Sequence, residues 1–178
     1  MNKKQKKEQK TENIIEVEDL NVIYNKSKPN EVRALENVNL KVRSQEWVIV
    51  FGPSGCGKST LLNSIAGLET PTSGKVKVRG GDINQLDSDE KARYRQNEVG
   101  MIFQSFHLIN SLTVLENVCL PRVFMGAQIS ERRKAAQEHL ARFGIAGQAG
   151  KYSSQISGGQ RQKVSIARAL MNEPGIIL

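Results

Sequence analysis

The sequence lacks an apolar run long enough to cross a bilayer, which takes about 20 residues in a helix. Residues 1–7 are lysine-rich and no apolar stretch follows them, which excludes a secretory signal. Only two cysteines are present, Cys56 and Cys119, and their spacing excludes a metal-binding pair. We therefore expect a cytoplasmic protein with free thiols. Two isolated histidines, His107 and His139, are interpreted as surface or packing residues.

Acidic residues are too few to balance the basic ones, and the net charge is +8. Five lysines and one glutamate lie within residues 1–10. We interpret residues 1–12 as a basic, solvated and disordered tail. The alternative is attraction to anionic lipid or nucleic acid. No aromatic residue is interleaved with the lysines, so no specific nucleic-acid site is predicted.

A glycine-rich loop is the first motif that the chain does contain. The apolar run Trp47–Phe51 predicts a buried strand before it, and Lys58–Ala66 has helical spacing after it. The loop fits the phosphate-binding pattern G-x-x-x-x-G-K-[ST], and its residues are Gly52, Pro53, Ser54, Gly55, Cys56, Gly57, Lys58, Ser59 and Thr60. The alternative, a chance glycine turn, is disfavoured by this strand–loop–helix context.

The residue types of this loop suit a bound polyphosphate. Glycines let backbone amides wrap the phosphates at the positive end of a helix. Lys58 would reach the β- and γ-phosphates, the Ser59 hydroxyl would bind Mg²⁺, and Thr60 would support the α- and β-phosphates. The loop therefore predicts ATP and Mg²⁺ as ligands.

A second motif, Ile156-Ser157-Gly158-Gly159-Gln160, precedes a predicted helix over Gly158–Met171. It offers amides, a hydroxyl and a helix N-terminus to an anion. Taken alone, the motif is equally well a flexible loop.

The remaining patterns predict an α/β fold with a parallel sheet and a helical subdomain over about 104–157. We expect strands at Ile14–Tyr24, Val38–Val42, Lys75–Arg79, Val99–Phe103 and Gly175–Leu178. We expect further helices at Ser88–Gln96, Thr113–Leu120 and Ser130–Phe143, with Ser88 and Ser130 as N-caps.

With these motifs the chain resembles the ATP-binding subunits of ABC transporters. The matching segments are Gly52–Thr60 (Walker A), Phe103-Gln104 (the Q-loop), Ile156–Gln160 (the signature) and Val164–Leu170. Within that family it is most similar to the group that serves lipoprotein release and macrolide export, through Val32–Val38, Gly67–Gly74, Phe106–Ile109 and Leu112–Val118. The resemblance implies a P-loop NTPase core with an N-terminal antiparallel β part, in one ATP-binding domain over 13–178.

The resemblance also assigns roles to single residues. Tyr24 would stack on adenine, although from its position alone it is a strand-end aromatic in the core. Gln104 would touch Mg²⁺ and the attacking water, so Lys58 and Gln104 are the expected catalytic residues, and Ser59 and Gln104 the metal ligands. The signature residues, which are Ser157, Gly158, Gly159 and Gln160, would contact ATP held by a second subunit in a head-to-tail dimer.

A transmembrane permease is the other implied partner. Segment Phe106–Arg122 would face it, although its apolar residues fit helical core packing equally well. We therefore expect the chain at the inner face of the cell membrane, coupling ATP hydrolysis to export or release of a substrate that the permease determines.

The chain departs from the family pattern in two places. Ile156 replaces a usual leucine at conserved volume. The sequence ends at Leu178, where the resemblance places the Walker B aspartate and glutamate. We expect a truncated product or fragment with an incomplete C-terminal fold and no ATP turnover. The alternatives are a nucleotide-binding remnant without hydrolysis, or a soluble ABC ATPase acting on nucleic acid.

Overall fold

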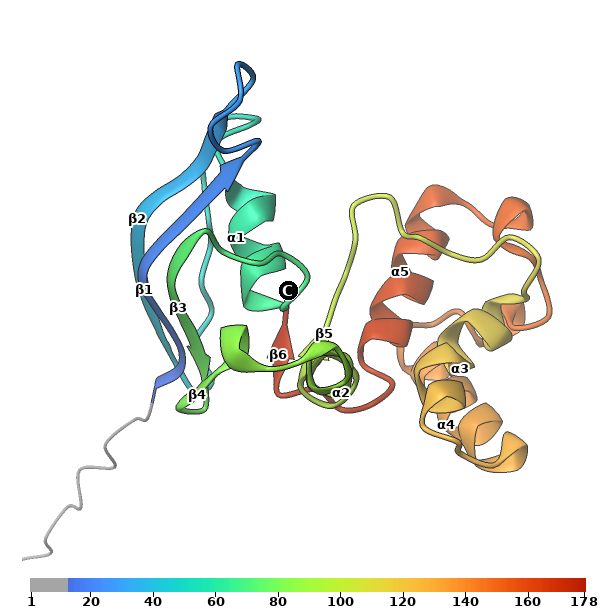
Figure 1. Cartoon of the computed structure of the whole chain (residues 1–178). Helices are drawn as coiled ribbons and strands as arrows, with labels where there is room; N and C mark the ends of the chain where they lie inside the picture. The colour runs from blue at the N-terminus through green and yellow to red at the C-terminus, as the bar shows by residue number, and fades with distance from the viewer. Residues whose placement is uncertain (1–12) are drawn as a thin grey trace, which may run out of the picture. The chain divides into compact units, whose positions relative to one another are not determined.

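The computed structural model describes residues 13–178, so the expected tail at residues 1–12 lies outside the described residues. The chain divides into two compact units, of which the first ends at Lys91 and the second begins at Ala92. Strands dominate the first unit and helices the second (Figure 1).

The first unit is built on a four-stranded antiparallel sheet with the order β2-β1-β3-β4. Its strands are β1 (Asn13–Tyr24), β2 (Val32–Arg43), β3 (Ser73–Val78) and β4 (Gly81–Asp82). Ile15 and Val17 of β1 are buried, and so are Leu20 and Val22. The register against β2 shifts between Val17 and Leu20, which returns the apolar side chains to the buried face after one extra residue.

Helix α1 (Lys58–Ile65) lies against this sheet and contacts β2 (Figure 1). Its buried face consists of Leu61, Ser64 and Ile65. The Ser64 hydroxyl donates a 2.8 Å hydrogen bond to the Thr60 carbonyl, so the buried polar group is satisfied. A 3₁₀ turn, η1 (Ile83–Gln85), then leads to α2 (Ser88–Glu98), which runs across the division between the units.

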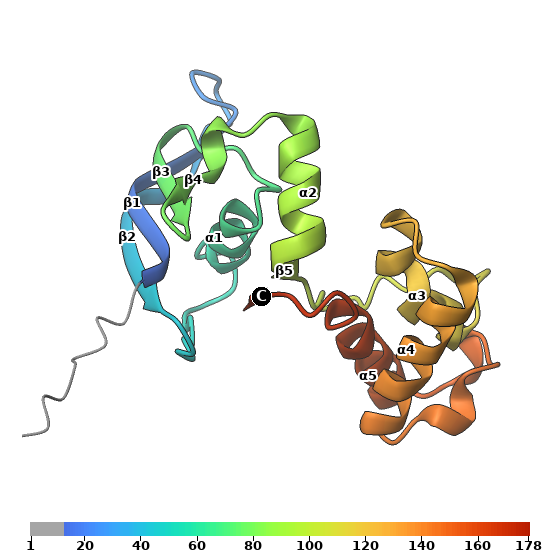
Figure 2. The same ribbon diagram turned by 90° about the horizontal axis from the view of Figure 1, so that it is seen from below.

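Three helices form the core of the second unit: α3 (Val114–Phe124), α4 (Ile129–Arg142) and α5 (Gly158–Ala169). Figure 2 shows them packed together. Their shared core contains Val118, Leu140 and Val164, all fully buried. Two 3₁₀ turns, η2 (Ala146–Gln148) and η3 (Ser153–Gln155), lie between α4 and α5.

A short parallel pair joins β5 (Val99–Gly100) to β6 (Ile176–Ile177) in the second unit. The Leu178 amide donates to the Gly100 carbonyl at 3.0 Å, and the Ile102 amide donates to the Leu178 carbonyl at 2.9 Å. Gly100 has no room for a side chain, because an added Cβ would lie 2.6 Å from the Ala169 carbonyl oxygen. The parallel pairing predicted for this part of the chain is therefore present.

The predicted buried strand Trp47–Phe51 is wrong for this structure. The segment has no regular structure, and Trp47 and Phe51 are each 96% exposed. Within residues 13–178 neither sheet includes it. Its apolar residues give it the character of a central strand, but a strand forms only when another strand pairs with its backbone.

Two predicted N-caps are also wrong, each by one or two residues. Asp87, and not Ser88, caps α2, since its carboxylate accepts from the Glu90 amide at 2.8 Å. The Glu90 carboxylate accepts in return from the Asp87 amide at 2.9 Å. Helix α4 begins after Gln128, which places Ser130 inside the helix.

Candidate functional site

The glycine-rich loop leads directly into α1 through Gly57. This residue has φ of 89°, in the left-handed region, and is the N-cap of the helix. A Cβ there would lie 2.3 Å from the Ala34 carbonyl oxygen of β2. Glycine is therefore required both by the backbone angle and by the close approach of β2.

The Lys58 side chain folds back across this loop. Its ammonium group donates to the carbonyl oxygens of Gly52 at 2.8 Å and Pro53 at 2.6 Å, and lies 3.5 Å from the Cys56 sulfur. The two carbonyl acceptors are neutral, so they orient the lysine without cancelling its charge. The loop consequently presents a positive charge together with the backbone that surrounds it.

The first turn of α1 provides the remaining donors. It contains no acidic residue, and no side chain caps its amides. Amides at this position have no partner inside a helix, so they are free to bind an anion. Ser59 is exposed at the same turn.

Magnesium fits this site as an ion that arrives with a nucleotide. In residues 13–178 no group of three or more His, Cys, Asp or Glu could hold a metal ion. Mg²⁺ commonly keeps several waters and binds through one or two protein groups plus substrate phosphates. The exposed Ser59 hydroxyl suits that role as a single ligand.

Tyr24 lies beside the same helix turn, at the end of β1. Its hydroxyl donates to the Glu69 carboxylate at 2.9 Å and lies 3.4 Å from the Thr60 hydroxyl. The contact with Thr60 lowers the pKa of Tyr24, but partial burial and the bond to Glu69 raise it, with a net increase. Tyr24 is 37% exposed, so it is not a core residue.

The signature motif forms the start of α5. Ser157 is the N-cap, and its hydroxyl accepts from the Gln160 amide at 3.3 Å. The Gln160 side chain accepts in return from the Ser157 amide at 2.9 Å. Gly158 and Gly159 are exposed, with no atom of another residue near the position of a Cβ. Buried Ile156 fixes the motif to the helical core.

Gln104 is exposed and lies four residues after β5, in the second unit. Two residues further on, Phe106 and His107 both adopt positive φ. The rings of Phe103 and His107 pack with centroids 4.6 Å apart. The structure therefore gives the segment around Gln104 a defined shape.

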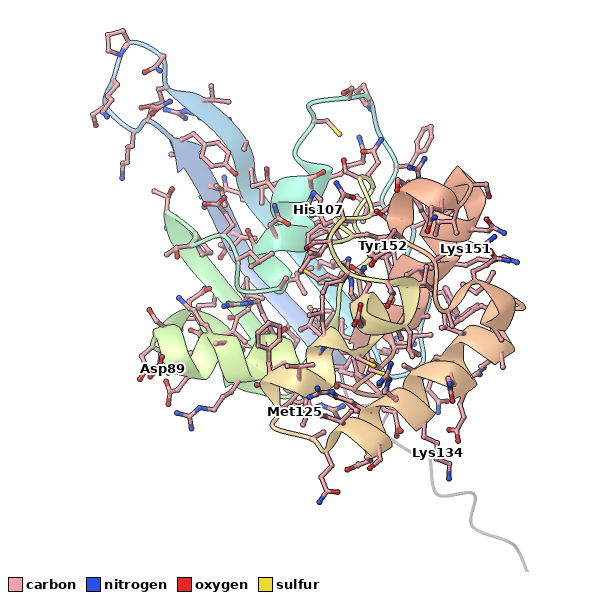
Figure 3. The ribbon with its side chains drawn as sticks, turned by 90° about the vertical axis from the view of Figure 1, so that its right-hand side faces the viewer. Asp89, His107, Met125, Lys134, Lys151 and Tyr152 are labelled. Carbon is pink, nitrogen blue, oxygen red and sulfur yellow. The ribbon has the colours of Figure 1, made fainter. Side chains whose placement is uncertain are left out.

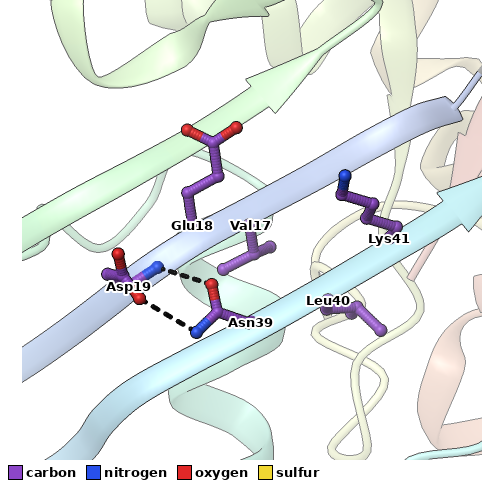
Figure 4. A pocket seen from close by; sticks show the side chains of 6 residues that line it. All are labelled: Val17, Glu18, Asp19, Asn39, Leu40 and Lys41. Atoms are coloured by element: carbon purple, nitrogen blue, oxygen red, sulfur yellow. Dashed lines mark hydrogen bonds between the residues drawn. The ribbon is translucent and has the colours of Figure 1, made fainter.

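A separate pocket of about 480 Å³ lies on the first unit, between β1 and β2 (Figure 4). Asp19 has φ of 45° and its amide donates to the Asn39 side chain at 3.0 Å. The Asn39 amide group donates back to the Asp19 carboxylate, also at 3.0 Å. The pair holds the irregular register of the two strands, so we interpret the pocket as structural.

Two structurally important residues were missed in the sequence. Asn117 is buried and its amide group donates to the carbonyls of Ile109, Leu112 and Thr113. Arg168 donates to two carbonyls in the segment after Gln104. The only available signal for Arg168 was its spacing of seven residues from Arg161, which puts both on one face of α5.

Comparison with known proteins identifies the family. Residues 35–178 match the family model described as ABC transporter. An ABC transporter ATP-binding protein of Methanocaldococcus jannaschii is 46% identical, over 92% of this chain and 73% of that protein. The macrolide export ATP-binding/permease protein MacB of Mannheimia succiniciproducens is 43% identical, over 93% of this chain and only 26% of that protein. In residues 13–178 no helix has the length and apolar character needed to span a membrane.

Solved structures agree with this assignment. A dimeric ATP-binding cassette in a post-hydrolysis state, bound to ADP and Pi, is 42% identical with a TM-score of 0.85. The match covers 92% of this chain and 72% of that chain. The predicted fold, a P-loop NTPase core with an antiparallel N-terminal part and a helical part, is confirmed. The chain belongs to the ABC transporter ATP-binding family.

Proposed function

We propose that this chain binds ATP with Mg²⁺ and is the ATP-binding subunit of a membrane exporter. The observation that carries the proposal is the loop before α1. Gly57 gives α1 its left-handed N-cap, and the Lys58 ammonium donates to the neutral carbonyls of Gly52 and Pro53. Such a loop offers positive charge and unpaired amides to a polyphosphate.

The other candidate residues take their proposed roles from the family. Tyr24 lies beside Thr60, where its partly exposed ring is available to the base of a nucleotide. Mg²⁺ bound through Ser59 and the phosphates would neutralise charge on the phosphates, and the family resemblance gives Gln104 the role of a second ligand. The signature, Ser157–Gln160, would contact a nucleotide held by a second copy. The dimeric form of the similar solved cassettes supports such a partner.

Replacement of Lys58 tests nucleotide binding. Calorimetric titration of the Lys58→Ala variant with ATP should show little or no binding, because the lysine neutralises charge at the β- and γ-phosphates. Lys75→Ala is the matched control, since it removes the same charge from an exposed position on β3 of the same unit. Equal ATP affinity in the wild type and Lys58→Ala would refute the site.

The permease partner is supported by relatives whose names join ATP-binding and permease activities. The predicted docking segment Phe106–Arg122 is partly unsuited to contact, because Val118 and Cys119 within it are buried. Exposed apolar side chains lie just beyond it, at the corner between α3 and α4. This corner patch consists of Val123, Phe124, Met125 and Ile129. We place the permease contact at the corner patch.

Cysteine crosslinking tests this contact. Cys119 cannot serve as the probe, because it is 4% exposed, whereas Met125 is 53% exposed (Figure 3). Met125→Cys should crosslink to a permease encoded beside this gene and co-expressed with it. Lys134→Cys, exposed on α4, is the control position (Figure 3). Equal crosslinking at both positions, or crosslinking at Lys134→Cys only, would place the contact elsewhere.

A further inference from the structure

The turn that follows Gln104 has an unfavourable backbone. Phe106 has φ of 60° and His107 has φ of 46°, and neither is a glycine or an asparagine. Two successive bulky residues in the left-handed region are uncommon, because each Cβ crowds the neighbouring carbonyl. A conformation of this kind persists only where the surroundings hold it.

Arg168 holds this turn from the last part of α5. Its guanidinium donates through Nη1 to the His107 carbonyl at 2.6 Å and through Nη2 to the Phe106 carbonyl at 2.6 Å. The planar fork of an arginine is suited to two adjacent acceptors in this way. Burial lowers the pKa of Arg168, and the two carbonyl oxygens compensate for the water that the guanidinium has lost.

Two more contacts fix the same turn. The His107 ring packs on Phe103, and the Arg161 guanidinium lies 6.0 Å from the centroid of the Phe106 ring. Arg161 and Arg168 are seven residues apart, so they occupy one face of α5. The turn therefore lies against that face of α5.

Helix α5 begins at the signature, with Ser157 as its N-cap. The helix that would contact the second nucleotide is thus the same rigid element that holds the turn after Gln104. We propose that Arg168 is a positioning residue, which fixes the Phe106–His107 turn and thereby joins the Gln104 segment to the signature helix. The role of this contact in ATP hydrolysis rests on the proposed function. The contact between α5 and the Phe106–His107 turn does not depend on it.

Amide exchange measured without nucleotide tests the link directly. The Phe106 amide donates to the Phe103 carbonyl at 3.0 Å, and the His107 amide donates to the Ser105 carbonyl at 2.7 Å. In Arg168→Met, exchange of both amides should accelerate by about tenfold or more, as expected when charge-assisted hydrogen bonds are lost. Arg168→Lys should have a smaller effect, because it keeps the charge but loses the fork.

Arg122→Met provides the matched control for this measurement. Arg122 is another guanidinium of the second unit, and its Nε donates to the Met171 carbonyl at 3.1 Å. The control should leave exchange at Phe106 and His107 within about twofold of the wild type, a change well below that of a lost charged bond. Equal acceleration by both variants, or none in a folded Arg168 variant, would overturn the proposal. If Arg168→Met does not fold, Arg168→Lys takes its place: faster exchange at Phe106 and His107 than in Arg122→Met supports the proposal, and equal exchange overturns it.

A second readout distinguishes positioning from general destabilisation. ATP affinity is measured with and without Mg²⁺ in the wild type, Gln104→Ala, Arg168→Lys and the double variant. A positioning role predicts that Arg168→Lys reduces the gain from Mg²⁺ as Gln104→Ala does, and that the double variant shows no further loss. An equal fall in affinity with and without Mg²⁺ would contradict it. Absence of ATP binding in the wild type would refute the proposed function, while the exchange measurement would still decide the link.

Discussion

Substitution of Gly57 by alanine separates two reasons for a glycine in the phosphate loop. The backbone angle alone, φ of 89°, penalises any residue with a Cβ by roughly 1–2 kcal/mol. The added Cβ would also lie 2.3 Å from the Ala34 carbonyl oxygen and 2.9 Å from the Leu35 side chain. Because one of these atoms belongs to the backbone of β2, relief requires movement of the strand or the loop, at a further cost of about 1–3 kcal/mol.

Gly55 supplies a matched control two residues earlier. Its φ is 81°, but nothing lies within 4 Å of an added Cβ. Gly55→Ala should therefore lower the free energy of unfolding by only about 1–2 kcal/mol. Gly57→Ala should lower it by about 2–5 kcal/mol. Urea unfolding followed by far-ultraviolet circular dichroism measures both, and equal losses would refute the argument that β2 crowds Gly57.

Two further predictions concern the start of α3. Asn117→Ala should lower the free energy of unfolding by about 2 kcal/mol, because the buried Asn117 side chain is the donor to the Ile109 carbonyl and the acceptor from the Ile109 amide; urea unfolding measures the loss. The Thr113 amide and hydroxyl hold the pKa of Glu116 below its usual range. The stabilisation is thus complete above the unfolded-state pKa and disappears as the pH falls through the folded-state pKa. Glu116→Gln should remove this contribution to acid sensitivity, seen as a smaller shift in the urea midpoint between about pH 7 and about pH 3.

The parts of the fold that the sequence predicted well are those determined locally. Helix α1 begins where Gly57 permits a left-handed N-cap, and the sheet of the first unit follows the apolar pattern of β1. The first residue of each helix was harder to predict from the sequence. Asp87 and Ser88 are both good N-caps, and only the reciprocal hydrogen bonds between Asp87 and Glu90 decide between them. The strand predicted at Trp47–Phe51 failed for a non-local reason. Its apolar residues favour a strand, but they cannot supply the neighbouring strand with which its backbone would have to pair.

The shape of the Gln104 segment could not be predicted for a different reason. Phe106 has no preference for positive φ and His107 only a weak one, so no strong local signal marks the turn. The group that holds it, Arg168, lies more than sixty residues further along the chain. Contacts between residues so distant in sequence depend on the packing of α5, which a single sequence does not specify.

The signature shows how one set of atoms serves both structure and the proposed function. The Ser157 hydroxyl accepts from the Gln160 amide, which uses a lone pair and leaves its proton available as a donor. The Gln160 side chain likewise accepts through its oxygen and keeps the donors of its amide group. Capping of α5 therefore occupies the backbone amides of Ser157 and Gln160, but it leaves these side-chain donors for an anion at the same helix end. The reciprocal bonds fix both side chains, so a phosphate would meet donors that are already oriented.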